Sequence, residues 1–308
     1  FNKIIKKQSM FRAVFDKNKA CQSILDEVPY YEIVVDDWEG KCETEIVELT
    51  KEKRERMSHT VFDVENWPLF EINYSKISKD EFCAFISFDL LIADGKSLAD
   101  LAGLIMDDNE GIDILSSKSM EFEDFIYAKE KEKKNKRYEV SQNYWGEMLN
   151  DIADAPNIID SDATSNENLH FRRLEYFVDK NHWSQIKNKL NEHKISPSMG
   201  ALAAYCAVMG YWSNQEKFTI NSPIMSYFKR KKEYAEVLGD FTEALLVPAE
   251  KYNTNEEFIS YIKRISNSFV NSYRHNAFDG IDVMNLLRNN RGERVVMPIV
   301  FTSMLVKE

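Results

Sequence analysis

Residues 81–97 read EFCAFISFDLLIADGKS, and this stretch joins the strongest strand signal of the chain to a turn and a helix start. The run over residues 81–92 is almost continuously apolar, which predicts a β-strand that is buried on both faces. Asp94-Gly95 predicts a turn. Ser97, with Asp100 three residues later, resembles a capping box, so we expect Ser97 to be the N-cap of the following helix.

Two carboxylates of this stretch border the apolar run. Burial of Asp89 in such a run costs free energy unless the carboxylate has a partner. Asp89 therefore either accepts hydrogen bonds from nearby backbone or arginine donors or is retained for a function. For Asp94 we expect a structural role, in which the side chain shapes the turn and pairs with an arginine.

The composition excludes several classes of protein. The chain has 308 residues with 40 Lys+Arg and 51 Asp+Glu, which gives a net charge of −11 and a pI near 5.2. Such an acidic chain is a poor candidate for sequence-independent binding of nucleic acid, because that binding depends on neutralising phosphates. No apolar run reaches the roughly 18 residues that would span a membrane, and no secretory signal is present.

The cysteines and histidines indicate no metal site. Cys21, Cys42, Cys83 and Cys206 form no CxxC pair, and the five histidines show no HxxxH or HExxH spacing. We expect buried, reduced thiols and a cytoplasmic protein. The chain starts at Phe1 rather than at methionine, inside a predicted helix, so we also expect that an N-terminal piece is missing.

The length suggests about two units of roughly 150 residues each. The polar segment 150–170 is the best linker candidate, and it divides the chain into an N-terminal lobe of residues 1–160 and a C-terminal lobe of residues 161–308. Helices and strands mix in both halves without strict alternation, which predicts an α/β fold (mixed α+β) rather than an all-α bundle. Periodicity predicts helices over 1–15, 43–60, 121–149, 180–193, 198–213, 255–273 and 280–288, and strands over 31–36, 69–74, 217–221, 243–247 and 295–301.

Familiar nucleotide-binding and hydrolase motifs are missing from the sequence. No GxGxxG, GxxxxGK[ST] or GxSxG pattern occurs, which argues against a common dinucleotide fold, a P-loop protein and an α/β-hydrolase. Two basic runs each have two interpretations. Residues 129–137 form either a solvated helix face or a docking patch for an acidic partner, and residues 229–232 form either a solvated loop or a contact with an acidic carrier protein or its phosphopantetheine phosphate.

Asp89, Asp94 and Ser97 together fit the pattern DxxxxDxxS. This pattern resembles the signature of the heterocyclization domains of nonribosomal peptide synthetases, which are relatives of condensation domains. Condensation domains carry HHxxxDG at the same place. Here Asp89 stands at the first histidine position and Leu90 at the second, catalytic one, while Asp94-Gly95 keeps the DG pair.

Other segments resemble the same family along essentially the whole chain. They are FNKIIKKQSMFRAV at 1–14, WPLF at 67–70, EDF at 123–125, YW at 144–145, GDFT at 239–242, RH at 274–275 and PIVFTS at 298–303. The resemblance implies two chloramphenicol-acetyltransferase-like lobes that form a V with a central tunnel. It also implies that the chain is truncated at both ends and that its C-terminal lobe is incomplete.

The resemblance implies a reaction and its partners. The amine of a Cys, Ser or Thr held as a carrier-protein thioester attacks an upstream acyl thioester. The side-chain thiol or hydroxyl then closes a thiazoline or oxazoline ring with loss of water. Upstream and downstream carrier proteins deliver these substrates on phosphopantetheine arms, the domain itself binds no cofactor, and other synthetase domains of the same assembly line are further partners.

The resemblance also implies which residues act. Thr302, in the VFTS segment, supports cyclodehydration, since its hydroxyl both donates and accepts. Asp89 and Asp94 complete the catalytic set. The residues expected to line the tunnel are Ser97, Ser226 and Ser303.

Two departures from the family pattern keep other functions open. Residues 224–227 read IMSY where many members have LFNR, so Ser226 replaces an asparagine, and the chain ends at Glu308 before a PQVxLD segment whose aspartate is the partner of the threonine. The alternatives are an amide-forming condensation domain or simple acyltransferase, and a non-catalytic module that recruits carrier proteins. Leu90 argues against the histidine-dependent reaction, and Ser226 keeps the recruitment module open.

Overall fold

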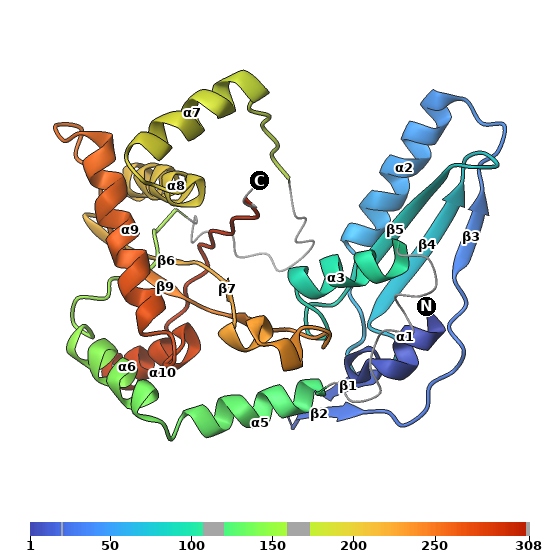
Figure 1. Ribbon diagram of the computed structural model, residues 1–308, viewed down its shortest axis with the longest axis horizontal. Helices are drawn as coiled ribbons and strands as arrows, with labels where there is room; N and C mark the ends of the chain where they lie inside the picture. The colour runs from blue at the N-terminus through green and yellow to red at the C-terminus, as the bar shows by residue number, and fades with distance from the viewer. Residues whose placement is uncertain (20, 107–119, 159–172, 306–308) are drawn as a thin grey trace. The chain divides into compact units, whose positions relative to one another are not determined.

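The computed structural model describes residues 1–19, 21–106, 120–158 and 173–305 (Figure 1). Contacts divide the chain into two compact units: unit 1 comprises Phe1–Tyr127 and Ser226–Phe241, and unit 2 comprises Ala128–Met225 and Thr242–Glu308. Both units mix helices with short sheets, so the predicted α/β class is confirmed. The predicted boundary between residues 160 and 161 and most of the predicted linker lie outside the described residues, so the two lobes, their V and their tunnel stay predictions.

Unit 1 begins with a helix that is shorter than predicted. Helix α1 covers Asn2–Lys7, and the chain continues as the 3₁₀ turn η1 (Ser9–Arg12) and strand β1 (Ala13–Asp16), which pairs with β2 (Cys21–Ile24). The guanidinium of Arg12 explains the early end, because it donates to the carbonyl oxygens of Ile5 at 2.8 Å and Lys6 at 2.9 Å. These last-turn carbonyls would otherwise lack partners.

A three-stranded sheet forms the centre of unit 1. Its order is β3 (Val34–Asp37), β4 (Phe70–Lys76) and β5 (Phe82–Phe88), with β3 parallel and β5 antiparallel to β4. Helix α2 (Glu43–Ser58) lies along one face, where Met57 packs with Trp38 and Phe85 (Figure 1).

The prediction of a strand buried on both faces over residues 81–92 is wrong. Strand β5 ends at Phe88 and has one neighbour among the described strands, so Phe82 and Ile86 are 56% and 47% exposed. The rest of the run is apolar because it packs into the core as a turn: Ile92 and Ala93 are fully buried where the chain turns toward the next helix.

An aromatic cluster joins the ends of the sheet to α1. Phe70 lies at 4.9–5.8 Å, between ring centroids, from Phe1, Phe11, Tyr31 and Phe88. The Tyr31 hydroxyl also accepts a hydrogen bond from the Ile72 backbone N–H at 2.9 Å. Large aromatic side chains in tilted and edge-on contact supply much of the apolar area that stabilises a small unit.

The ion pair between Arg56 and Glu71 is expected to make the stability of unit 1 depend on pH. A hydrogen bond from Arg56 at 2.6 Å lowers the pKa of Glu71, a bond from Asn73 at 2.8 Å adds to this, and partial burial opposes it. The stabilisation is therefore present above about pH 4.5 and is lost as the pH falls through the lowered pKa. We expect Glu71→Gln to cost about 0.5–1 kcal/mol near pH 7, since the pair is partly exposed, and nothing near pH 3.

Urea unfolding of the wild type and Glu71→Gln across this pH range measures the difference. A difference that stays constant down to pH 3 would contradict the assigned ion pair.

Unit 2 contains most of the helices. They are α6 (Lys136–Glu147), α7 (Lys180–Glu192), α8 (Pro197–Ser213), α9 (Phe258–Arg274) and α10 (Gly280–Arg291), while α5 (Phe122–Glu132) crosses from unit 1 into unit 2. The predicted caps are confirmed: the Asp179 carboxylate accepts from the backbone of Asn181 and His182, and Ser196 accepts from Met199 ahead of Pro197. Side chains that bond the first free N–H groups fix where these helices begin.

The core of unit 2 has two parts. Helices α8 and α9 pack against the antiparallel pair β6 (Lys217–Asn221) and β9 (Leu246–Glu250), with Leu202, Phe218 and Tyr261 fully buried (Figure 1). A second cluster forms around Trp145 and Leu287 of α6 and α10. Strands β7 (Ile224–Met225) and β8 (Thr242–Glu243) make a further antiparallel pair.

Two more predicted elements differ from the structure. The stretch 121–149 is not one helix, because the chain turns at residues 133–135 between α5 and α6. The predicted strand 295–301 is reduced to a single parallel bridge between Asn221 and Val300, in a segment where Pro298 has no N–H to donate.

The four cysteines differ in their exposure to solvent. Cys206 is buried, but Cys21 and Cys42 are exposed, so the expectation of uniformly buried thiols is wrong. Among the described residues, no helix is both long enough and apolar enough to cross a membrane.

Candidate functional site

Asp94 lies in unit 1 at the start of helix α3 (Gly95–Met106), and it is only 4% exposed. One carboxylate oxygen accepts the backbone N–H of Ser97 at 2.7 Å, and the other accepts the backbone N–H of Phe241 at 2.9 Å. Both oxygens are therefore occupied by backbone donors. The expected arginine is absent: no arginine in the described part of the chain forms an ion pair with Asp94.

Ser97 does not cap the helix as predicted. Helix α3 begins at Gly95, and Asp94 is the capping residue, since its side chain bonds the N–H three residues on and its carbonyl bonds Leu98. The Ser97 hydroxyl instead donates to the carbonyl oxygen of Gly239 at 2.8 Å and accepts its N–H at 3.2 Å. The Asp94 N–H also donates to the Gly239 carbonyl, at 3.1 Å.

These bonds join two of the motifs that carry the family resemblance. Asp94 and Ser97 of DxxxxDxxS hold two residues of GDFT, Gly239 and Phe241. All of the atoms involved are buried, where hydrogen bonds contribute most and an unpaired partner costs most. We call this set of contacts the motif clamp.

Gly239 is required by the packing around the clamp. A Cβ at this position would lie 2.2 Å from the ring of Phe122. That ring packs against Phe125 and Phe241 at centroid distances of 5.3 Å. The first residue of α5 therefore closes the clamp from the outside, and only glycine leaves room for it.

Asp89 is less buried than its place in the apolar run predicts. It is half-buried, and its carboxylate accepts the backbone N–H of Leu91 at 2.9 Å. Its own N–H donates to the Leu69 carbonyl, and its carbonyl accepts from Ile92. The structure thus places Asp89 in a turn that links β5 to the buried Ile92-Ala93 pair, with a local backbone partner of the kind expected.

Gln8 holds the same segment as the clamp, although no sequence motif marks this residue. Its amide N–H donates to the Glu236 carbonyl at 2.9 Å, and its amide oxygen accepts the Leu238 N–H at 3.0 Å. Gln8 is 6% exposed and lies where the chain leaves α1, inside the stretch predicted as helix. Only the tertiary fold brings residues 228 positions or more apart into contact.

Ser226 opens this segment and is completely buried. Its N–H donates to the Phe241 carbonyl at 2.8 Å, so the two ends of 226–241 are joined. Its hydroxyl has no hydrogen-bond partner among the described residues.

The basic run 229–232 is not a uniformly solvated loop. Lys229 is 5% exposed, whereas Arg230 and Lys232 are exposed. The Lys229 ammonium donates to the carbonyl oxygens of residues 234, 235 and 237 and pairs with the carboxylate of Asp100. The solvated-loop interpretation is therefore wrong for this lysine.

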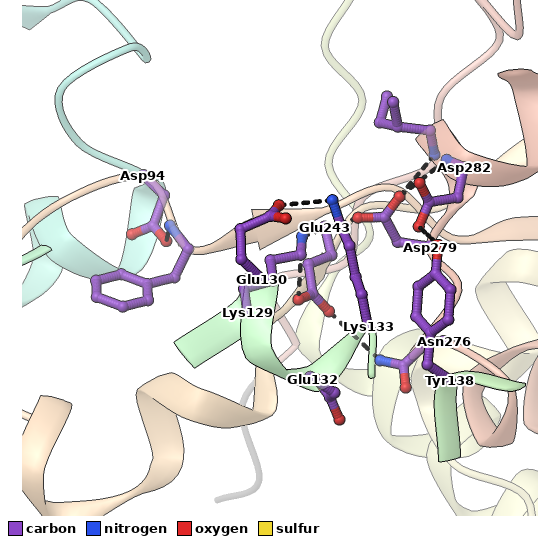
Figure 2. A network of polar contacts seen from close by, with 12 residues as sticks. Asp94, Lys129, Glu130, Glu132, Lys133, Tyr138, Glu243, Asn276, Asp279 and Asp282 are labelled. Carbon is purple, nitrogen blue, oxygen red and sulfur yellow. Dashed lines mark hydrogen bonds and ion pairs between the residues drawn. The ribbon is translucent and has the colours of Figure 1, made fainter. Parts of the chain in front are cut away.

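The basic run 129–137 is likewise partly internal to unit 2. Lys129 bonds Asp279 at 2.8 Å and pairs with Glu243 at 3.5 Å (Figure 2). Burial lowers the pKa of Lys129, but the two carboxylates outweigh it and raise the pKa overall. Asp279 also caps α10, so this lysine ties α5 to the start of α10.

Neighbouring side chains extend the same network. Arg137 bonds Glu132 and Asn276. The Tyr138 hydroxyl bonds Asp282 at 3.3 Å (Figure 2). Burial and the nearby Asp282 carboxylate raise the pKa of Tyr138 to about 12. The hydroxyl therefore stays protonated and serves as a donor at neutral pH.

Thr302 and Ser303 lie in unit 2, near the end of the chain. Thr302 is exposed, and the Ser303 hydroxyl donates to that of Ser198 at 2.9 Å. Of the six predicted site residues, the structure thus brings Asp94 and Ser97 into the motif clamp, with Ser226 at the start of the clamped segment and Asp89 in the preceding turn. A hydroxyl open to solvent is able to meet a substrate, whereas both oxygens of Asp94 are already occupied.

Comparison with known proteins identifies the family. The family model described as "Condensation domain" matches residues 1–308, the whole chain. The chain is 29% identical to bacitracin synthase 1 of Bacillus licheniformis and 25% identical to pyochelin synthetase PchF of Pseudomonas aeruginosa, over 98% of its length in both cases. It is 23% identical, over 82% of its length, to phenyloxazoline synthase MbtB of Mycobacterium bovis.

These relatives are much longer proteins. The chain spans 6% of bacitracin synthase 1, 17% of PchF and 18% of MbtB. Among solved structures, the EpoB cyclization-docking bidomain from Sorangium cellulosum matches with a TM-score of 0.76 at 23% identity, covering 98% of this chain and 62% of that one. With its mixed α/β fold and its matching family model, the chain belongs to the condensation-domain family.

Proposed function

We propose that this chain is the heterocyclization domain of a nonribosomal peptide synthetase. The first step joins the amine of a carrier-bound Cys, Ser or Thr to the acyl group of an upstream carrier thioester, and the upstream thiol leaves. In the second step the side-chain sulfur or oxygen bonds to the new amide carbon. The former carbonyl oxygen then departs as water with one proton from the side chain and one from the amide nitrogen, which leaves a C=N bond.

The observation that carries the proposal is the composition of the signature turn. Leu90 and Asp89 stand where an amide-forming condensation domain has its two histidines, so no imidazole is available there. The Asp94-Gly95 pair nevertheless matches the DG of the condensation-domain motif, and Asp94 is hydrogen-bonded to the backbone of GDFT. The name of one relative, phenyloxazoline synthase, supports a ring-forming member of the family.

The roles we assign follow from the environment of each side chain. Asp94 is a positioning residue, because both of its oxygens are occupied by backbone N–H groups. Thr302 is the catalytic candidate, because its exposed hydroxyl is free to donate to the leaving oxygen during dehydration. The condensation step depends mainly on holding two thioesters in line, which contributes roughly 7–11 kcal/mol in favourable cases.

The partners follow from the same proposal. Upstream and downstream carrier proteins bring the acyl groups on phosphopantetheine arms, and the exposed members of the run 229–232 are suited to an acidic surface. Mass spectrometry of the downstream thioester, with one acylated carrier and one cysteine-loaded carrier, tests the activity. A condensed product lacking one water supports the proposal, a hydrated amide indicates an amide-forming condensation domain, and no product with carrier binding intact indicates a recruitment module.

Thr302→Ala is expected to separate the two steps. We expect condensation to continue while dehydration falls by about 10²-fold or more, since one well-placed proton donor contributes roughly that factor. Thr302→Ser should restore part of the dehydration, and Thr254→Ala, at another exposed threonine of unit 2, should leave both steps unchanged. Dehydration at the wild-type rate in Thr302→Ala would remove this residue from the mechanism.

A further inference from the structure

Lys229 is the most completely buried cation of unit 1 for which the structure gives contacts. Its side chain is 2% exposed. The ammonium donates to the carbonyl oxygens of Val237 at 2.5 Å, Ala235 at 3.0 Å and Tyr234 at 3.4 Å. It also lies 5.1 Å from the centroid of the Phe241 ring. A three-donor ammonium fits such a set of acceptors, and no other side chain has this shape.

Charged groups from helix α3 surround this ammonium. The Asp100 carboxylate lies 3.4 Å away and also pairs with Lys96. Burial lowers the pKa of Lys229, and the charges of Asp100 and Asp94 oppose that decrease while Lys96 adds to it. The two carboxylates thus offset part of the cost of burying the cation.

The carbonyls that Lys229 holds come directly before the motif clamp. Lys229 bonds the carbonyls of residues 234, 235 and 237, and Gln8 bonds the backbone of residues 236 and 238. Asp94 and Ser97 bond the backbone of residues 239 and 241. Within 234–241, residues 235 and 236 are exposed and the others are buried or half-buried; Tyr234 ends a short 3₁₀ turn (Lys232–Tyr234), and residues 235–241 form neither helix nor strand. Turn bonds engage the N–H groups of Tyr234, Ala235 and Val237, and the side chains supply partners for other backbone groups of the segment. Side-chain donors and acceptors therefore act together with these turn bonds to set the position of the segment.

We propose that Lys229 is a positioning residue for the condensation and cyclization reaction: by holding the carbonyls of Tyr234, Ala235 and Val237, it fixes the approach of GDFT to Asp94 and Ser97. This inference rests on the proposed function for its effect on catalysis, but the positioning itself is a property of unit 1. Lys229 touches the backbone of the segment rather than substrate, so it is not assigned a chemical step. The exposed neighbours Arg230 and Lys232 have no such role.

Hydrogen exchange tests the positioning without any substrate. In Lys229→Met, we expect the amides of residues 234–241 to exchange about tenfold faster or more, which corresponds to about 1.4 kcal/mol or more, while the β3–β4–β5 sheet exchanges as in the wild type. Lys79→Met, at an exposed lysine of the same unit, is the control and should change neither. A uniform increase over all of unit 1 would overturn the proposal, because it would mean a loss of global stability only.

Turnover with loaded carriers then tests the effect on the reaction. We expect Lys229→Met to lower kcat by about tenfold or more with the KM for both carriers within about threefold, and Lys229→Arg to recover part of the loss because it keeps the charge. Should Lys229→Met fail to fold, Lys229→Gln keeps two donors without the charge and takes its place. Wild-type kcat in a folded variant, or a raised KM with kcat unchanged, would overturn the proposal.

The hydrogen-exchange and turnover measurements distinguish a failure of the proposed function from a failure of the positioning role of Lys229. If the wild type forms no product, the proposed function fails, and the exchange measurement still decides whether Lys229 positions the segment.

Discussion

Asp94→Ala is expected to lower the free energy of unfolding by about 2–5 kcal/mol. The substitution leaves the backbone N–H groups of Ser97 and Phe241 without acceptors, and each unpaired buried group costs roughly 1–3 kcal/mol. It also removes the cap of α3, which is worth about 1 kcal/mol and overlaps with the first of these losses. Urea unfolding followed by circular dichroism measures the change.

Two further substitutions control for this effect. Asp94→Asn keeps one acceptor oxygen but turns an NH₂ group toward the other backbone donor, so it should lose at least half as much as Asp94→Ala. Asp89→Asn changes a half-buried side chain with one local backbone bond, and we expect less than about 1 kcal/mol. Equal losses at Asp89 and Asp94 would contradict the motif clamp as the main contribution of this signature.

Gly239→Ala is expected to be as damaging, although it adds a single methyl group. The new Cβ would lie 2.2 Å from Cδ2 of Phe122, and that ring is held by Phe125 and Phe241. Overpacking of a filled core costs about 1–3 kcal/mol, and more where a ring has to leave its site. We expect a loss in the upper part of that range, together with faster hydrogen exchange of residues 239–241.

Gly103→Ala is the matched control for this substitution. Gly103 lies within α3 of the same unit, and a Cβ there would meet nothing within 4 Å. Alanine favours the helix over glycine by about 0.5–1 kcal/mol, so this variant should be slightly more stable than the wild type. If Gly239→Ala were also neutral, the close approach of Phe122 to the clamp would be wrong.

The sequence predicts the elements whose signals are local. The caps at Asp179 and Ser196 lie within three residues of their partners, and the helices they start were predicted almost to the residue. The apolar run at 81–92 was misread because its composition does not distinguish a strand from buried turn residues. In that run the residues beyond Phe88 are apolar because the turn that follows packs into the core.

Only the site residues that belong to a recognisable motif could be predicted from the sequence. The pattern DxxxxDxxS marks Asp94 and Ser97, but their partners at Gly239 and Phe241 are more than 140 positions away and belong to a different motif. Gln8 and Lys229 belong to no motif, and the charge of Lys229 suggests solvent. Their roles depend on which backbone groups the fold leaves without partners, and no local pattern records that.

Heterocyclization is tested most directly by supplying the condensed intermediate, in which the amide bond is already formed. A downstream carrier bearing the condensed but uncyclised acyl-cysteine is incubated with the chain, and the thioester is followed by mass spectrometry, so that condensation is not required. We expect the mass to decrease by one water with the wild type and to stay constant with Thr302→Ala. An unchanged mass with the wild type, under conditions in which it still condenses donor and acceptor, would contradict heterocyclization and leave an amide-forming condensation domain.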